Sequence, residues 1–395
     1  MDSKKIILKK DRDRSARQHH PWVFSGAIDR VDGNPVLGET VEVWSKDGEF
    51  LGRAAYSPHS KIRARFWSWE NIEITPEFFA ARIGKAIESR KRLCLEQAQP
   101  AVRLVYAESD GLPGIIVDRY RDTLVLQCLS AGAEFWRFEI VKALVRLTGL
   151  SQVFERSDVD VRELEGLPQR TGQMSGPPIL DRTIIQENGL TFLVNIRSGQ
   201  KTGFYIDQRP NRQRVRDLVA GLSVLNCFCY TGAFSVYALA GQASRVLSVD
   251  SSAEALAAGR ENLALNGYPL DNAEWLEGDV FQVLRLFRDQ ARKFDAIILD
   301  PPKFAPTAAQ AEKAARGYKD INLLAFKLLN PGGLLFTFSC SGGISAELFQ
   351  KIVAGAALDA RVDARIIEHL AQGPDHPIAL NFPEGAYLKG LVCQI

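Results

Sequence analysis

The chain has 395 residues, of which 46% are hydrophobic and 24% are charged, and its formal net charge at pH 7 is +2. This length predicts two or three domains, each able to bury its own core, and the ordinary composition excludes a disordered or fibrous chain. The charge is too mild to argue for a nucleic-acid partner by itself, and no apolar run approaches the roughly 18 residues that span a bilayer. The N-terminus also lacks an apolar signal core, so we expect a cytoplasmic protein without a membrane partner.

The first 20 residues are more basic than the chain as a whole. Seven Lys and Arg side chains stand there against three Asp, which gives this stretch a charge of +4. A solvated basic tail is one interpretation and a contact with nucleic acid is the other.

The six cysteines are scattered through the chain, at positions 94, 128, 227, 229, 340 and 393. They lack the paired spacing of a zinc site, and a chain of this length needs no disulfides to hold it together. We therefore expect reduced thiols and no bound metal.

The first predicted module is a small β-barrel at residues 1–75. Short β-type runs, such as those at 39–44 and 62–67, are separated by Asp-Gly and Pro turns. In the second run Arg63 and Arg65 alternate with apolar residues, so one face of that strand is expected to be basic. Such a face is either simply solvated or suited to the backbone and bases of RNA.

The second predicted module, at residues 76–190, is of the α+β type. A helix is expected over 76–95, followed by strands at 102–106, 114–118 and 123–127 and a helix near 135–147. The Gly- and Pro-rich segment 166–178 marks the end of this pattern.

From residue 191 to 395 strands and helices alternate. Apolar strands are predicted at 224–226, 245–249, 294–299 and 333–338, each before a turn or a helical pattern. This alternation indicates a doubly wound parallel sheet, in which a ligand lies outside the carboxyl ends of the strands. Residues directly after each strand are therefore the candidates for function.

Two of these strand ends favour an adenosine ligand. The segment NCFCYTGAF at 226–234 leads from a strand to a helix through Gly232, and it lacks the G-x-G-x-x-G pattern of pyrophosphate binders. Asp250 follows the next strand, where a carboxylate can accept both ribose hydroxyls. A helix N-cap role for Asp250 or Ser251 is a competing and compatible interpretation.

The next two strand ends supply further polar groups. Asp279 and Val280 could hold the adenine amino group and ring face, although turns that contain Asp are common. The segment DPPKF at 300–304 is stiffer, because two prolines fix the backbone and leave carbonyl groups and the Asp300 carboxylate available to a planar polar substrate.

The last strand end carries the segment FTFSCS at 336–341. A cysteine is usually a small buried hydrophobe, which is what we expect of Cys94, Cys128 and Cys393. Cys340 differs because it ends a predicted sheet strand among small hydroxyl side chains, where a thiol can reach the ligand. We therefore predict that Cys340 is a nucleophile.

At these strand ends the sequence resembles class I methyltransferases, and more narrowly the bacterial 23S ribosomal RNA large-subunit cytosine-C5 methyltransferase family. The resemblance spans nearly the whole chain and rests on segments that occur in order, at 20–26, 108–114, 201–209, 226–234, 300–304, 316–322 and 338–341.

The resemblance implies a fold and a set of ligands. The barrel would be an RNA-binding module of the PUA type, and the last domain a Rossmann-like methyltransferase domain that binds S-adenosylmethionine. The partner would be 23S ribosomal RNA or an assembling large subunit, and a homodimer is left open. The implied cofactor-binding residues are Asn226, Phe228, Tyr230, Thr231, Gly232, Asp250, Ser251, Asp279 and Val280.

The resemblance also implies the chemistry, because C5 of cytosine is too weak a nucleophile to take a methyl group unaided. The thiolate of Cys340 would add to C6, and Asp300 would stabilise the developing charge. Lys303, like Arg63 and Arg65, is predicted to bind RNA. It occupies the position at which better-known RNA cytosine-C5 enzymes carry a second cysteine. Water, Asp300 and Lys303 therefore all remain candidates for removing the C5 proton.

Two other functions compete with this one. The DPPKF segment also resembles amine-binding turns, so the enzyme could methylate an exocyclic amine of guanine or adenine, with Cys340 as a bystander. A non-catalytic ribosome-assembly factor that keeps the cofactor fold is the second rival, and binding of the cofactor together with transfer of the methyl group discriminates among the three.

Overall fold

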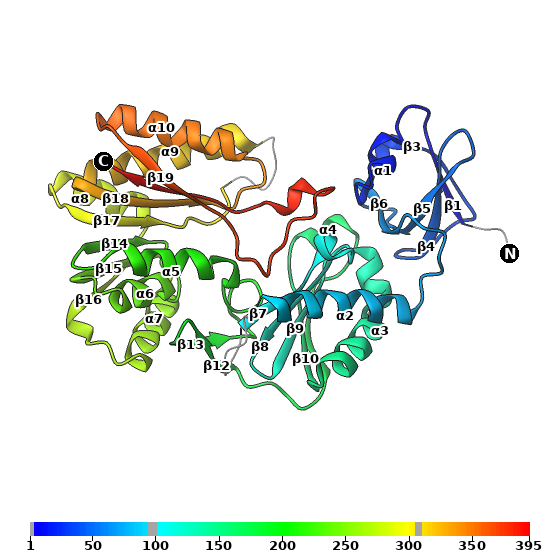
Figure 1. The fold of residues 1–395 in the computed structure, drawn as a ribbon, viewed down its shortest axis with the longest axis horizontal. Coiled ribbons are helices and arrows are strands. Elements are labelled where there is room, and N and C mark those ends of the chain that lie inside the picture. The colour runs from blue at the N-terminus through cyan, green and yellow to red at the C-terminus, as the bar shows by residue number, and fades with distance from the viewer. Residues whose placement is uncertain (1–3, 94–100, 305–309) are drawn as a thin grey trace. The chain divides into compact units, whose positions relative to one another are not determined.

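The computed structural model describes residues 4–93, 101–304 and 310–395, and these form two compact units (Figure 1). The first unit contains Met1–Ile185, Val194–Ile206 and Pro374–Gly385. The second contains Gln186–Leu193, Asp207–Gly373 and Ala386–Ile395. The chain thus passes between the units several times. The domain boundaries expected at residues 75 and 190 stay a prediction, because the barrel and the central module share the first unit.

The N-terminal part of the first unit is a six-stranded barrel-like sheet with the strand order β2-β6-β5-β4-β1-β3. Its core is apolar and includes Ile6, Val43, Ala54 and Phe66. The basic N-terminal stretch is not a tail over its described residues, since β1 pairs with β3 and β4. The elements are β1 (Lys5–Leu8), α1 (Arg14–Arg17), β2 (Trp22–Phe24), β3 (Ile28–Asp32), β4 (Thr40–Trp44), β5 (Phe50–Tyr56) and β6 (Ile62–Ser68).

The central module is a five-stranded sheet with the order β11-β10-β9-β8-β7, on which α2 and α3 pack (Figure 1). Ala55 and Trp67 of the barrel belong to its hydrophobic core, so the two parts are packed together. The Gly- and Pro-rich segment 166–178 contains the edge strand β11. Cys94 lies outside the described residues. The elements are α2 (Pro76–Arg92), β7 (Ala101–Tyr106), β8 (Ile115–Tyr120), β9 (Thr123–Cys128), α3 (Ala131–Thr148), β10 (Gln152–Ser157), α4 (Val161–Leu164) and β11 (Arg170–Ser175).

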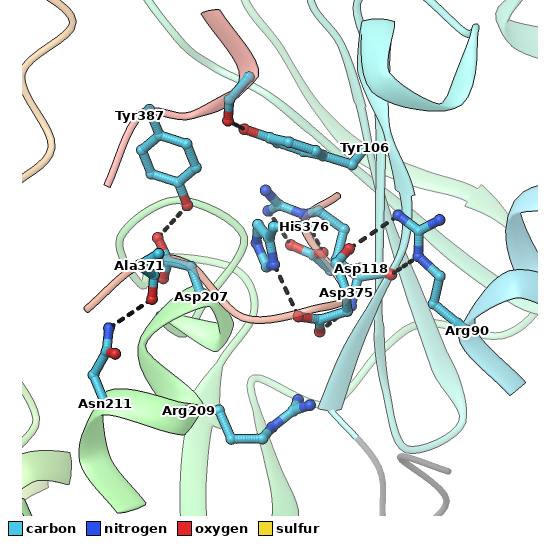
Figure 2. A network of polar contacts seen from close by, with 12 residues as sticks. Arg90, Tyr106, Asp118, Asp207, Arg209, Asn211, Ala371, Asp375, His376 and Tyr387 are labelled. Carbon is cyan, nitrogen blue, oxygen red and sulfur yellow. Dashed lines mark hydrogen bonds and ion pairs between the residues drawn. The ribbon is translucent and has the colours of Figure 1, made fainter. Parts of the chain in front are cut away.

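The C-terminal segment of the first unit is held by a buried network of charged groups (Figure 2). The carboxylate of Asp375 accepts from the backbone N–H of Arg103 at 3.1 Å, and its carbonyl oxygen accepts from Arg90 at 2.9 Å. Arg103 also forms a bidentate pair with Asp118, at 2.8 Å for both bonds. His376 contacts Asp375 at 2.9 Å. Charges this deeply buried are stable when they are paired in this way.

The second unit contains a seven-stranded sheet with the order β16-β15-β14-β17-β18-β20-β19. Strands β14 to β18 are parallel, and β20 is antiparallel to both of its neighbours. Helices α5 to α7 lie on one face and α8 to α10 on the other, as Figure 1 shows, which is the predicted doubly wound arrangement. The two-stranded hairpin β12-β13 precedes this sheet.

The bounds of these elements follow the predicted alternation closely. They are β12 (Arg182–Glu187), β13 (Leu190–Asn195), α5 (Arg209–Leu218), β14 (Ser223–Cys227), α6 (Ala233–Ala240), β15 (Arg245–Asp250), α7 (Ala253–Leu265), β16 (Ala273–Glu277), α8 (Val280–Asp289), β17 (Phe294–Leu299), α9 (Ala311–Leu328), β18 (Leu329–Ser339), α10 (Ala346–Ala360), β19 (Arg365–Leu370) and β20 (Lys389–Gln394). Within the described part of the chain, no helix is both long enough and apolar enough to span a membrane.

Candidate functional site

The loop between β14 and α6 has a strained backbone. Phe228 and Tyr230 have φ angles of 58° and 47°, and Gly232 has 70°. Residues other than glycine rarely adopt these left-handed backbone angles, and such strain is typical of functional sites. Two of the hydrogen bonds that hold the loop connect it to β15: the N–H of Cys229 donates to the carbonyl of Val249 at 3.1 Å, and the N–H of Tyr230 donates to Asp250 at 2.8 Å.

Asp250 uses both of its carboxylate oxygens to organise this part of the sheet. Oδ2 accepts from Tyr230, and Oδ1 accepts from the N–H of Ser252 at 3.0 Å. Each oxygen keeps a further lone pair, so the carboxylate can also accept a ribose hydroxyl. The N-cap of α7 is Ser252, whose hydroxyl accepts from Ala255 at 3.2 Å, so the expectation that Asp250 or Ser251 caps this helix is wrong.

Gly232 is required for a second reason besides its backbone angle. A Cβ atom built on it would lie 2.5 Å from the ring of Trp275 on β16. The same ring would meet a Cβ on Gly259 of α7 at 2.3 Å. The ring of Trp275 thus packs closely on the backbone of residues 228–232, which we call the cofactor loop, and holds this loop against β16 and α7.

Asn226 and Thr231 position this loop from within the protein. Asn226 is fully buried, and its amide donates to Ser235 at 2.8 Å. The carbonyl of Thr231 accepts from Asn262 at 2.9 Å. The Asn226 side chain therefore connects the end of β14 to α6 through its hydrogen bond and has no surface that a ligand could contact in this structure.

The start of α8 contains two of the residues predicted to bind the cofactor, Asp279 and Val280. Asp279 is the N-cap of the helix, and its side chain accepts from the N–H of Gln282 at 3.0 Å. Val280 is 3% exposed and belongs to the hydrophobic core, which leaves little of its side chain for an adenine ring, and its contact with the cofactor stays a prediction. The helical period turns Val280 inward, and its neighbour Phe281 is partly exposed instead.

Phe281 joins an aromatic cluster that the sequence did not predict. Its ring centroid lies 6.4 Å from that of Phe228 and 5.9 Å from that of Phe304. Phe304 also packs against Tyr318 of α9, with centroids 4.8 Å apart. Four segments that follow or flank the parallel strands thus meet at the carboxyl edge of the sheet. Asp250 ends the neighbouring strand β15 at the same edge of the sheet.

Strand register brings Asp300 and Cys340 to this same edge. Leu299 pairs with Cys227 of β14 on one side and with Thr337 of β18 on the other. Asp300 therefore follows β17 between the cofactor loop and the end of β18, where Cys340 stands. Neighbouring strands lie about 4.8 Å apart, so the row of three strand ends spans about 10 Å.

Cys340 differs from the other described cysteines in its exposure. It is partly exposed, whereas Cys128, Cys227, Cys229 and Cys393 are buried. Burial raises the pKa of Cys393 to about 12 and raises those of the other three as well. These four thiols stay neutral at physiological pH, so none of them is a competing nucleophile.

Two side chains that the sequence did not single out contact the residue after Cys340. The phenol of Tyr318 lies 2.9 Å from the hydroxyl of Ser341, and Lys389 donates to the Ser341 carbonyl at 2.8 Å. Burial raises the pKa of Tyr318, so its phenol stays protonated. Tyr318 lies in the segment 316–322, which is one of those that carry the family resemblance, whereas Lys389 lies in none of them.

The residues predicted to bind RNA lie in different environments. Arg65 is 7% exposed and pairs with Glu165 at 2.8 Å, because its face of β6 packs on the central module. The expectation that this face of β6 is basic and open to solvent or RNA is therefore wrong at Arg65. Arg63 is half-buried and donates to the carbonyls of Ser57 and Pro58. Lys303 is exposed, three residues beyond Asp300.

Substitution of Gly232 should weaken binding of the cofactor. In Gly232→Ala the new methyl group clashes with Trp275, and the left-handed backbone adds a strain of about 1–2 kcal/mol. We expect the loop to move and the Kd for S-adenosylmethionine, measured by calorimetry, to rise at least about tenfold.

Gly221→Ala is the matched control for this substitution. Gly221 has a φ of 74°, no atom lies within 4 Å of its Cβ position, and it precedes β14 at the opposite end of the strand. It carries the same backbone strain and should leave the Kd unchanged. Equal Kd values for Gly232→Ala and the wild type would contradict the role given to the loop.

Comparison with known proteins agrees with this architecture. Residues 168–391 match the family model of S-adenosylmethionine-dependent methyltransferases, and residues 6–69 match that of PUA-like domains. A SAM-dependent methyltransferase of Streptococcus mutans has a similar structure, with a TM-score of 0.86 at 21% identity over 99% of this chain and 100% of that one. A methyltransferase complexed with SAH has a TM-score of 0.87 at 22% identity, again over 99% of this chain and 100% of that one. These likenesses support the predicted fold.

Curated relatives are much more similar in sequence. The ribosomal RNA large subunit methyltransferase I of Aeromonas salmonicida is 53% identical over 390 residues, which are 98% of each chain. The protein of the same name from Shewanella amazonensis is 51% identical over 99% of each chain. With the methyltransferase family model, this identity means that S-adenosylmethionine is the cofactor. The chain belongs to the ribosomal RNA large subunit methyltransferase I family.

Proposed function

We propose that this protein methylates C5 of a cytosine in 23S ribosomal RNA, and that Cys340 is the nucleophile. The names of the relatives support ribosomal RNA as the substrate. The observation that carries the choice of carbon 5 is the place of Cys340, a partly exposed thiol at the carboxyl edge of the sheet, one strand away from Asp300.

The site residues prepare the reacting groups. Bound S-adenosylmethionine supplies an electrophilic methyl group on a positively charged sulfur. The loop at 228–232 and Asp250 hold the adenosine part, and the rings of Phe228, Phe281 and Phe304 exclude water from one side of it. The base enters next to Asp300 and Cys340.

Covalent addition makes C5 reactive. The thiolate of Cys340 forms a bond to C6, and the electron pair of the C5–C6 double bond becomes available at C5, which takes the methyl group. Asp300, in its protonated form, can donate a hydrogen bond to N3, or as a carboxylate it can accept one from the exocyclic amine. Loss of the C5 proton then restores the double bond and expels the thiolate. Asp300 and Lys303 stand at this edge as candidate acceptors of that proton, and solvent water is a third.

The barrel supplies a positively charged surface for RNA, at a place other than the one predicted. Lys10, Arg12 and Arg14 are exposed, and within the described residues no carboxylate lies at ion-pair distance from them. By contrast, Arg30 and Lys46 of the same barrel are paired with Asp32 and Asp29. Unpaired cations bind phosphate without first giving up a partner, so we assign RNA contact to the 10–14 segment.

Substitution of Cys340 should abolish methyl transfer. With radiolabelled S-adenosylmethionine and ribosomal RNA, nucleoside analysis should find the label in 5-methylcytidine for the wild type and in no nucleoside for Cys340→Ala. Cys128→Ala, which removes a buried thiol of the first unit, should retain the activity. Label in a methylated purine would instead favour the amine-methylating function. Absence of label with the wild type would favour a non-catalytic factor.

Neutralising two charges of the 10–14 segment should weaken RNA binding. For Arg12→Gln with Arg14→Gln, we expect the slope of log K against log salt to fall by about 0.7 for each phosphate that the protein no longer neutralises. The double variant Arg30→Gln with Lys46→Gln removes the same charge from the barrel and should leave the slope nearly unchanged. Filter binding over a salt series measures both, and equal slopes for the two double variants would remove the 10–14 segment from the RNA surface.

A further inference from the structure

Lys389 lies beside the proposed nucleophile because of the antiparallel pairing of β18 and β20. It is the first residue of β20 and pairs with Ser339, the residue before Cys340. Its ammonium group donates to the carbonyl of Ser341, the residue after Cys340, at 2.8 Å. The side chain thus runs past the backbone of Cys340, and its charge is held at this point of the strand end.

The ammonium group lacks a carboxylate partner within the described residues. Lys389 is half-buried, and its one hydrogen bond there is to a neutral carbonyl. The pKa of Lys389 is lowered to about 8, chiefly by burial and to a smaller extent by the nearby Lys303, while a thiolate at Cys340 acts in the opposite direction. The phenol of Tyr318 faces the same point from α9, and its pKa is raised by burial and by Cys340. Desolvated ammonium groups are normally compensated by an anion. The thiolate form of Cys340, whose charge favours the protonated form of Lys389, would supply such an anion.

We propose that Lys389 is a positioning residue whose ammonium group stabilises the thiolate of Cys340. This inference rests on the proposed function, in which that thiolate attacks the base. The thiol proton passes to solvent, and no covalent bond to Lys389 is formed. When the C6–S bond later breaks, its electron pair returns to sulfur, and the same ammonium group stabilises the thiolate that leaves.

The experiment measures the reactivity of Cys340 directly, without RNA and without the cofactor. The full-length protein is treated with iodoacetamide over a pH series, and mass spectrometry follows alkylation of the peptide that contains Cys340. The variants are Lys389→Met and Lys389→Gln, which remove the charge, and Lys389→Arg, which keeps it. Lys351→Met, which removes an exposed lysine of α10 paired with Glu347, is the control.

In both neutral variants, the midpoint of the pH profile for alkylation should move up by about one pH unit. The rate below the midpoint should then fall about tenfold. Lys389→Arg should stay within about threefold of the wild type, and Lys351→Met should match it. Wild-type profiles in both neutral variants, or an Lys389→Arg profile equal to that of Lys389→Met, would overturn the proposal. Two neutral variants are included so that poor folding of one, seen in its thermal unfolding curve, leaves the other to decide.

Failure of this inference and failure of the proposed function give different results. If Cys340→Ala still transfers methyl groups, Cys340 is not the nucleophile, and the alkylation profile no longer bears on catalysis. If Cys340→Ala is inactive but the neutral variants of Lys389 alkylate like the wild type, then the nucleophile stands and Lys389 alone loses its role.

Discussion

The parallel register of three strands is the constraint on which the site depends. Cys227, Leu299 and Thr337 lie in one row across β14, β17 and β18, so the residues that follow these strands share one edge of the sheet. Everything proposed for the chemistry uses that row: the cofactor loop comes after the first strand, Asp300 after the second and Cys340 at the end of the third. Antiparallel β20 then adds a fourth strand to the row and pairs Lys389 with Ser339, the residue before Cys340.

The cofactor loop carries the strain of this arrangement. Two residues other than glycine take left-handed backbone angles there, and they are kept by bonds to Val249 and Asp250 and by the fit of Gly232 against Trp275. Strain of this kind persists where the surrounding structure determines the conformation. The loop is therefore formed by the protein before a ligand arrives, which lowers the cost of ordering it on binding.

The strand ends could be predicted from the sequence because a parallel sheet places its polar turns at one edge, whatever the details of packing. The expectation for Arg65 was wrong because the residue alternates correctly along β6, but the central module covers the face on which it lies. The burial of Val280 has another cause, since the period of α8 turns this residue toward the core. Lys389 could not be predicted, since its relation to Cys340 depends on the pairing of two strands that are far apart in the chain. The basic residues at 10–14 could be recognised in the sequence by their charge, but only the structure shows that no carboxylate of the described residues pairs with Lys10, Arg12 or Arg14.

Covalent attack by Cys340 on the base is the central claim, and one measurement tests it most directly. RNA that carries 5-fluorocytidine in place of cytidine has no C5 proton to lose, so the adduct should persist after methyl transfer. We predict that the protein, incubated with this RNA and S-adenosylmethionine, forms a denaturation-resistant complex in which mass spectrometry locates the nucleotide on Cys340. Turnover without any such complex, or a crosslink at another residue, would contradict the account.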